Sequence, residues 1–191
     1  MEPRRRLRVL TTVAALLAAR PAAARVLLTQ AQGLALAFPS GERVERRTAY
    51  LGPEQRRAAQ ERGRVKIESG VWTYYVGVAT AGVTGYAYFD SHVVRTAPET
   101  LMIVLEPDGS TRSVEVLSFL EPEDYLPNPR WLSQFHAKTL RDDLVAHRGV
   151  RNLSGASLTS DAAAAAVRRV LAVHAEIHAP PPSEKVKSPS R

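Results

Sequence analysis

The residues best suited to chemistry stand in the stretch SGASLTS (residues 154–160), directly before an alanine-rich run that predicts a helix. Its four hydroxyl side chains and its glycine have two possible uses. One is a helix cap, for which Thr159 or Ser160 is well placed. The other is an anion site, because the unpaired N–H groups and partial positive charge of a helix N-terminus attract phosphate, and glycine lets it approach the backbone. A hydroxyl such as that of Ser157 can also carry a phosphoester.

The stretch resembles the SGATLTS signature of the FMN-binding domain family, which includes flavin subunits of the sodium-pumping NADH:quinone oxidoreductase and of the Rnf electron-transport complex. A strand-rich middle, a Glu-Pro turn at Glu121, the motif and a closing helix also follow the family's order, over residues 65–178. The resemblance implies that Ser157 is joined to the phosphate of FMN by a phosphodiester bond, formed by a separate ApbE-type flavin transferase. The motif residues expected at the cofactor are Ser154, Gly155, Ala156, Ser157, Leu158 and Thr159.

Two positions depart from the family pattern. Ser157 stands where the family usually has threonine, and Arg151, three residues before Ser154, stands where the family favours aspartate. Serine keeps the hydroxyl but lacks the methyl group that restrains the threonine rotamer. Three alternatives to a covalent FMN carrier therefore stay open: a protein that binds FMN non-covalently, a flavin-free binding or assembly module of the same fold, and a flavin-dependent reductase that uses His92.

Residues outside the motif are also predicted to lie near the flavin ring. Tyr125 and Trp131 are aromatic residues of the segment before the motif, where they are less needed for packing than aromatic strand residues are. His92 or Arg95, in DSHVVRTAPET (residues 90–100), would place a cation by the reduced, anionic ring and stabilise it. The alternative interpretation of this charged segment is a solvated strand end.

Other patterns predict no catalytic or metal site. His174 and His178 are four residues apart, a spacing that can place two imidazoles on one metal ion, but no third ligand accompanies them and the HExxH arrangement is absent. The sequence shows no Ser–His–Asp order, paired catalytic carboxylates or glycine-rich nucleotide loop. We therefore expect a carrier, with membrane redox partners, rather than an enzyme with its own substrate.

The first 24 residues have the order of a secretory signal peptide: clustered arginines, an apolar run from Val9 to Ala19, and small residues ending at Ala24. The apolar run is shorter than the roughly 20 residues that span a bilayer. Cleavage after Ala24 is therefore favoured over a permanent anchor. We expect an exported, periplasmic protein associated with a membrane redox chain.

Charge and composition limit the function classes further. The formal net charge is +7, but residues 1–24 hold five arginines and one acid, and the terminal PPPSEKVKSPSR carries much of the remaining excess. A basic excess confined to such segments argues against nucleic acid as the partner. The chain has no cysteine, which excludes c-type haem attachment, iron–sulfur clusters and cysteine-ligated zinc. Any redox role then needs an organic cofactor, and the motif indicates FMN.

The hydrophobic pattern predicts an α+β fold. Helices are expected at residues 27–38 and 53–63. An antiparallel sheet of about four strands is expected from two hairpins, within residues 65–96 and 100–120. Short helices are predicted at 130–140 and 141–147, and a long final helix at 161–178.

These elements suggest a division of the chain. The predicted parts are a signal peptide (1–24), a helical preface (25–63), an FMN-binding domain (64–178) and a disordered Pro/Lys-rich tail (179–191).

Overall fold

The structure is a computed structural model that describes residues 25–39 and 41–179. The predicted signal peptide lies outside these residues, and so does the predicted tail except for Ala179.

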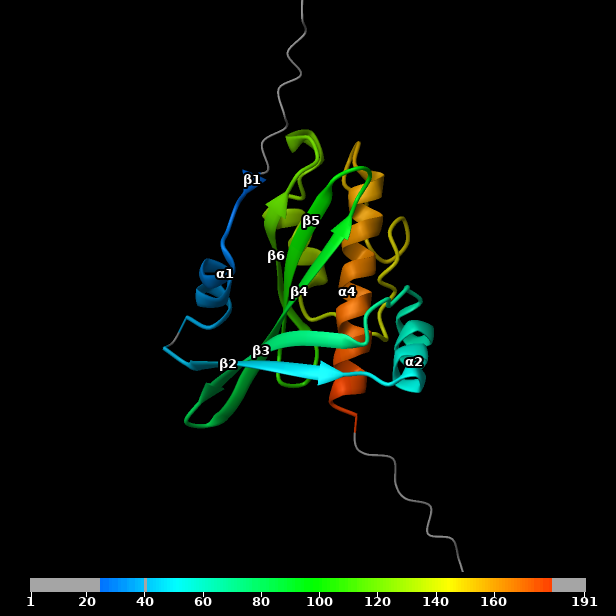
Figure 1. The fold of residues 1–191 in the computed structure, drawn as a ribbon. Helices are drawn as coiled ribbons and strands as arrows, with labels where there is room; N and C mark the ends of the chain where they lie inside the picture. Colours follow the sequence, from blue (N-terminus) through cyan, green and yellow to red (C-terminus); the bar gives the residue numbers. More distant parts are fainter. Residues whose placement is uncertain (1–24, 40, 180–191) are drawn as a thin grey trace, which may run out of the picture.

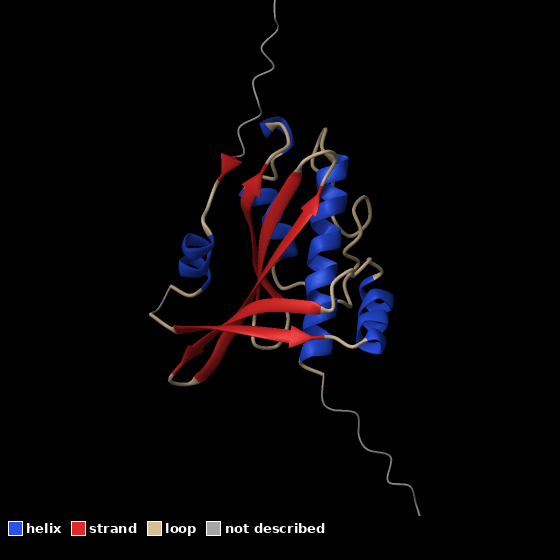
Figure 2. Ribbon diagram, in the orientation of Figure 1, coloured by secondary structure: helices blue, strands red, loops and turns tan. Residues whose placement is uncertain are grey.

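One antiparallel sheet forms the centre of the fold and confirms the predicted α+β class (Figures 1 and 2). Its spatial order is β1-β6-β5-β4-β3-β2. The strands are β1 (Arg25–Val26), β2 (Arg43–Tyr50), β3 (Val71–Ala79), β4 (Gly82–Val93), β5 (Pro98–Leu105) and β6 (Thr111–Phe119). The two predicted hairpins are therefore β3–β4 and β5–β6, with β4 and β5 paired between them.

The sheet has five long strands and the two-residue β1, where about four strands were expected. The additional long strand is β2, which lies within the segment interpreted as a helical preface and pairs with β3 along its whole length. The sequence of β2, RVERRTAY, lacks the alternation of a half-buried strand because most of its side chains are exposed at the sheet edge. Charged residues are common on such edges, since they discourage pairing with other strands.

The long helix α4 (Ser157–Ile177) covers one face of the sheet, and α1 (Gln30–Ala37) lies on the other (Figure 1). Small alanines on α4, including the fully buried Ala163 and Ala166, let the helix approach β4 and β5 closely. On the α1 side, Phe38 packs with Met102 and Val104 of β5. None of the helices in the described residues is long and apolar enough to span a bilayer.

The second helix of the predicted preface, α2 (Pro53–Gly63), packs along α4 (Figure 1). The Arg168 Nε group donates a hydrogen bond of 3.0 Å to the carbonyl oxygen of Gly63, at the end of α2. An ion pair of 3.0 Å also joins Arg62 to the buried Glu176. Both predicted preface helices are thus packed against the central sheet or its covering helix.

The segment between β6 and α4 contains only short helices. These are η1 (Glu123–Tyr125), α3 (Pro129–Leu132) and η2 (Ser133–Phe135). The prediction of a helix at residues 141–147 was wrong, since this segment forms turns and an isolated bridge between Ala146 and Val150. Its two charged turns, at Asp142 and Arg148, are stabilised by side-chain hydrogen bonds instead of a helical ladder.

The packing of α1 on the sheet depends on Gly77 in β3. A methyl group at this position would overlap the ring of Phe38 and the hydroxyl of Thr84. We expect Gly77→Ala to lower the free energy of unfolding by about 1–3 kcal/mol, the usual cost of overpacking, measured by urea denaturation. The matched control is Gly52→Ala, whose added Cβ would meet nothing closer than Gln55 Oε1 at 3.8 Å. An equal effect of both substitutions would contradict this account.

Candidate functional site

The motif residues 154–160 form the N-terminal end of α4, which begins at Ser157 instead of the predicted Asp161. Ala156 is the N-cap residue, and no side chain accepts a hydrogen bond from the first turn. The first turn also contains no acidic residue. A 21-residue helix therefore presents its first N–H groups and its positive dipole end without a carboxylate or hydroxyl to satisfy them.

The prediction that Thr159 or Ser160 caps the helix was wrong. Both residues lie inside the first turn and are buried. The Ser160 hydroxyl accepts a hydrogen bond from the main-chain N–H of Leu153 at 2.8 Å and donates one to the carbonyl of Ala156 at 3.1 Å. Ser160 thus fixes the chain that leads into α4, and the helix end itself stays open.

Gly155 sets the direction of the chain before the helix. Its φ of +75° lies in the left-handed region, which glycine adopts without the steric cost of a Cβ. A Cβ on Gly155 would meet no atom within 4 Å. The glycine is therefore required by backbone conformation, and the space beside it is open.

A pocket of about 190 Å³ lies at this end of α4. Five motif residues line it, from Gly155 to Thr159, and Ser154 does not. The remaining lining residues come from two other segments of the chain: Val94 and Arg95 from the loop between β4 and β5, and Glu121 and Tyr125 from the segment after β6. The structure thus places Tyr125 and Arg95 in the same pocket as the motif. Tyr125 is one of the two aromatic residues, and Arg95 one of the two cations, that were predicted near the flavin ring.

Glu121 positions the loop that carries Arg95. Its Oε1 accepts three main-chain hydrogen bonds, from Arg95 at 3.1 Å, Thr96 at 2.7 Å and Ala97 at 2.9 Å. These N–H groups lower the pKa of the Glu121 carboxyl below its usual value, and that of Thr96 has the largest effect. The Arg95 guanidinium carbon lies 6.0 Å from the centre of the Tyr125 ring. Among the described residues, the Arg95 side chain has no ion-pair partner, so its charge is available to the pocket.

The Ser157 hydroxyl is exposed and has one orienting neighbour. The Asn152 amide Nδ2 lies 3.1 Å from Ser157 Oγ, to which it donates, and 3.1 Å from the Nε2 atom of His147. The Asn152 Oδ1 atom is buried and has no hydrogen-bond partner in the part of the chain that the structure describes. Sequence reasoning missed Asn152, because its contact with Ser157 depends on the turn at Gly155.

Trp131, the other aromatic residue predicted near the flavin, lies in the core instead of the pocket. Its ring is 8% exposed and packs edge-on against Phe135. Its indole Nε1 donates a hydrogen bond of 2.7 Å to the carbonyl of Arg151. Gln134 Oε1 accepts a hydrogen bond from the Arg151 N–H at 2.8 Å. Trp131 and Gln134 therefore hold the backbone of Arg151, and the Arg151 side chain is exposed.

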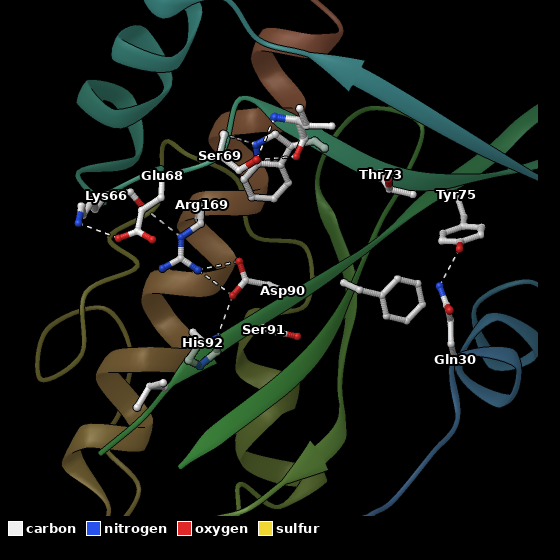
Figure 3. Close-up of a pocket in the computed structure, with 14 residues that line it drawn as sticks. Gln30, Lys66, Glu68, Ser69, Thr73, Tyr75, Asp90, Ser91, His92 and Arg169 are labelled. Carbon is white, nitrogen blue, oxygen red and sulfur yellow. Dashed lines mark hydrogen bonds and ion pairs between the residues drawn. The ribbon is translucent and has the colours of Figure 1, made fainter. Parts of the chain in front are cut away.

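His92 lies in a different hollow, a cleft of about 770 Å³ lined by residues of β3, β4, α1 and α4 (Figure 3). The ladder between β3 and β4 ends at Tyr74 and Tyr88, and the continuing parts of both strands line the cleft. Arg169 of α4 binds the Asp90 carboxylate through Nη1, at 2.7 and 2.6 Å. The structure thus separates His92 from the pocket that contains Ser157.

His92 is held between two buried carboxylates. Its Nδ1 lies 2.8 Å from Asp90 Oδ1, and its Nε2 lies 3.1 Å from Glu99 Oε2. Burial alone would lower the pKa of His92, but the hydrogen bonds with Asp90 and then Glu99 outweigh it and raise the pKa to about 9. At neutral pH both ring protons are therefore committed to carboxylates, and neither is available to a ligand in the cleft.

The histidines of the last helix contact Tyr88 and each other. His174 is buried and its Nδ1 lies 2.9 Å from the Tyr88 hydroxyl, while the ring of His178 lies 4.3 Å from that of His174. Burial, and then the neighbouring His178, lower the pKa of His174 to about 3. Across residues 25–39 and 41–179, no group of three or more His, Asp or Glu side chains is arranged to hold a metal ion.

Comparison of the chain with protein-family models gives no match. Comparison with curated protein sequences also finds no similar protein.

The His92 cluster predicts a loss of stability at alkaline pH. The pKa of His92 is raised from 6.5 to about 9, so its contribution is complete below pH 6.5 and is lost as pH rises through 9. From that shift we expect the free energy of unfolding to fall by on the order of 3 kcal/mol between about pH 6 and pH 10. Urea denaturation across this range measures the loss.

The control for this prediction is His92→Gln, which removes the titrating group while Asp90 and Glu99 remain. The variant is expected to be less stable than the wild type at pH 6 and to show a much flatter pH profile above pH 7. A wild-type profile as flat as that of the variant would show that His92 is not held protonated between the carboxylates.

Proposed function

We propose that this chain is an exported electron-transfer protein that carries FMN, with the FMN phosphate attached to Ser157 through a phosphodiester bond. The observation that carries the proposal is the open N-terminus of α4, which presents an exposed Ser157 hydroxyl in a pocket beside Arg95. The resemblance of residues 154–160 to the FMN-binding domain signature supports the same assignment.

The residues of the pocket suit a phosphate group. The first N–H groups of α4 have no side-chain acceptor and supply hydrogen-bond donors together with the helix dipole. Arg95 adds a positive charge that forms no ion pair among the described residues, although it acts on the Glu121 carboxylate. The nearest carboxylate of the pocket, that of Glu121, is already bonded to three main-chain N–H groups. The pocket therefore provides the positive potential that a phosphodiester needs.

The size of the pocket favours a covalent attachment over a non-covalent one. Sites that enclose a whole small molecule usually measure about 300–1,000 Å³, whereas this pocket measures about 190 Å³. It can surround a phosphate and the start of the ribityl chain but not an isoalloxazine ring. A covalent bond removes the need for an enclosing site, because the tether keeps the cofactor in place at any concentration.

The surrounding residues have roles in attachment and position. Asn152 orients Ser157 Oγ by donating to it. When an ApbE-type flavin transferase forms the phosphodiester, Ser157 Oγ would bond to the flavin-side phosphorus of a flavin dinucleotide. The pyrophosphate bond would break, the nucleoside monophosphate would leave, and the hydroxyl proton would pass to a base or to water. Gly155 allows the turn before the helix, and Tyr125 with Arg95 forms the opposite wall. When bound, FMN supplies the electron chemistry, and the protein supplies position and electrostatics.

The arrangement supports a carrier more than a flavin-dependent reductase. The reductase alternative assigns proton transfer to His92, yet both ring nitrogens of His92 contact carboxylates and the ring lies in the other cleft. The pocket at Ser157 contains no other histidine and no free carboxylate. Electrons would therefore pass between the bound flavin and redox partners at the membrane.

Co-expression with a flavin transferase tests the attachment site. We expect the wild-type chain to gain the mass of FMN minus water and to keep yellow fluorescence after denaturation on a gel. Ser157→Ala removes the nucleophilic oxygen and is expected to abolish both signals. Ser157→Thr restores the family's usual residue and is expected to label at least as well as the wild type.

The matched control is Ser154→Ala, which removes the other exposed motif hydroxyl, one that does not line the pocket. It is expected to keep the covalent flavin. Covalent flavin that survives in Ser157→Ala would disprove the attachment site. Flavin that is released on denaturation of the wild type would support non-covalent binding, and a wild-type chain without flavin would support the flavin-free module.

The departure at Arg151 makes a separate prediction about the transferase. Because the Arg151 side chain is exposed while its backbone is held by Trp131 and Gln134, it can be changed without loss of a contact in the described structure. If the transferase recognises the acid that the family favours, Arg151→Asp will raise the initial rate of flavin incorporation, followed by mass spectrometry over time. Arg130→Asp, a charge reversal at another exposed side chain outside the motif, should give no such gain.

A further inference from the structure

A third hollow, of about 250 Å³, is lined by residues from the end of α2, the turns of residues 140–148 and the middle of α4. Its lining includes five arginines, Arg62, Arg64, Arg141, Arg148 and Arg168, but only two acidic residues, Asp142 and Asp143. It shares no lining residue with the pocket at Ser157 or with the cleft at His92. We refer to it as the arginine pocket.

Arg168 is fixed at the wall of the arginine pocket. Its Nε donates to the carbonyl of Gly63 at 3.0 Å, and its Nη1 donates to the carbonyl of Leu144. Its Nη2 has no hydrogen-bond partner within residues 25–39 and 41–179. Burial, and then the charge of Arg169, lower the pKa of Arg168, although the carboxylates of Asp161 and Asp143 act in the opposite direction. Two carbonyl dipoles thus hold a cation where like charges repel it, and a bound anion would offset that repulsion.

Arg64 enters the pocket from an unusual backbone conformation. It is the C-cap residue of α2, with φ 48° and ψ 45°, a left-handed conformation that glycine normally occupies at a helix end. A side chain at such a position costs free energy, and the cost is commonly found at ligand-binding sites. In the described structure the Arg64 guanidinium has no hydrogen bond or ion pair. An arginine is therefore held here at the expense of backbone energy. Its guanidinium group is unpaired among the described residues, and its charge acts on the nearby Asp143 carboxylate.

The carboxylates of the pocket are already engaged. Asp142 accepts hydrogen bonds from the N–H and hydroxyl of Thr139, at 2.9 and 3.0 Å, and lies 3.2 Å from Lys138. Asp143 pairs with Arg148 at 2.8 Å. The side chain of Arg141, like that of Arg64, has no hydrogen bond or ion pair among the described residues. The pocket therefore keeps unpaired donors on Arg64, Arg141 and Arg168, and its five arginines outnumber its two carboxylates, which are partly engaged elsewhere.

We propose that the arginine pocket is an oxyanion-binding site for a phosphate or pyrophosphate group, bound by the guanidinium groups of Arg64, Arg141 and Arg168. Guanidinium groups pair with phosphate oxygens through parallel, charge-assisted hydrogen bonds, and arginine suits this role better than lysine because of its planar fork. Three guanidinium groups from three segments provide more donors than a single phosphate needs, so the site favours a ligand with several anionic oxygens.

Isothermal titration calorimetry with inorganic pyrophosphate, in about 0.15 M NaCl to screen exposed charges, tests the proposal on the full chain. The key variant is Arg64→Gly with Arg141→Gln. Loss of two charge-assisted contacts is expected to raise the dissociation constant at least about tenfold. Because glycine relieves the left-handed backbone at position 64, the melting temperature of this variant should not fall.

Two control variants separate the arginine pocket from other sources of binding. Arg57→Gln removes an exposed arginine of α2 that does not line the pocket, and it should leave the dissociation constant unchanged. Arg95→Gln removes the charge beside Ser157 and reveals any pyrophosphate that binds at that pocket instead. If Arg95→Gln abolishes binding while the double variant does not, pyrophosphate binds at the Ser157 pocket, and the present proposal is overturned.

Other results of the same titrations would also overturn the proposal. An unchanged dissociation constant in the double variant, an equal loss in Arg57→Gln, or no binding by the wild type would each overturn the proposal. Should the double variant fail to fold, Arg141→Gln alone, a change at an exposed side chain, must weaken pyrophosphate binding for the site to stand.

Discussion

The close packing of α4 on the sheet is the constraint on which the other features depend. Its buried face begins with small alanines and continues with Val167, Val170 and Leu171, and these residues pack in one core with the large side chains of β4 and β5. The helix therefore lies close to the strands and keeps one orientation. That orientation brings Ser157, at one end, to the loop between β4 and β5, and Arg168, in the middle, to the end of α2.

The two ends of α4 consequently have opposite chemical character. At the N-terminal end the donors are exposed, Gly155 and Ala156 leave the backbone accessible, and Arg95 adds positive charge. At the C-terminal end, His174 and Tyr88 are buried together among aromatic rings, and burial keeps the imidazole neutral. An anion is stabilised only at the first of these ends. The position of the motif at the N-terminal end is therefore consistent with a phosphate site.

Sequence reasoning predicted the parts of the fold whose signal is local. The hairpins β3–β4 and β5–β6 follow from runs of apolar and β-branched residues with a turn at Asp108 and Gly109, and α4 follows from its alanines. It missed β2, because an exposed edge strand such as RVERRTAY has no hydrophobic alternation to detect. It also predicted the wrong helix cap, since Ser160 is bonded to the preceding chain through contacts that spacing along a helix does not reveal.

Some residues of the candidate site could also be predicted from the sequence, and others could not. Residues 154–159 were predicted from a contiguous motif, and Tyr125 and Arg95 from their residue types and neighbourhood. The roles of Asn152 and Glu121 were not predicted, because each depends on a hydrogen bond whose geometry only the folded chain defines. His92 and Trp131 were assigned to the flavin by residue type, but the direction of a strand or helix places one in another cleft and the other in the core.

The contact made by Glu121 has a consequence for how such a site can diversify. Its carboxylate binds residues 95–97 only through their main-chain N–H groups, so the conformation of this loop does not depend on which side chains it carries. Arg95 could be exchanged for a neutral or acidic residue while the loop keeps its shape. The charge beside the pocket is in this sense independent of the scaffold, and related chains could adjust their electrostatics by substitutions at this one loop.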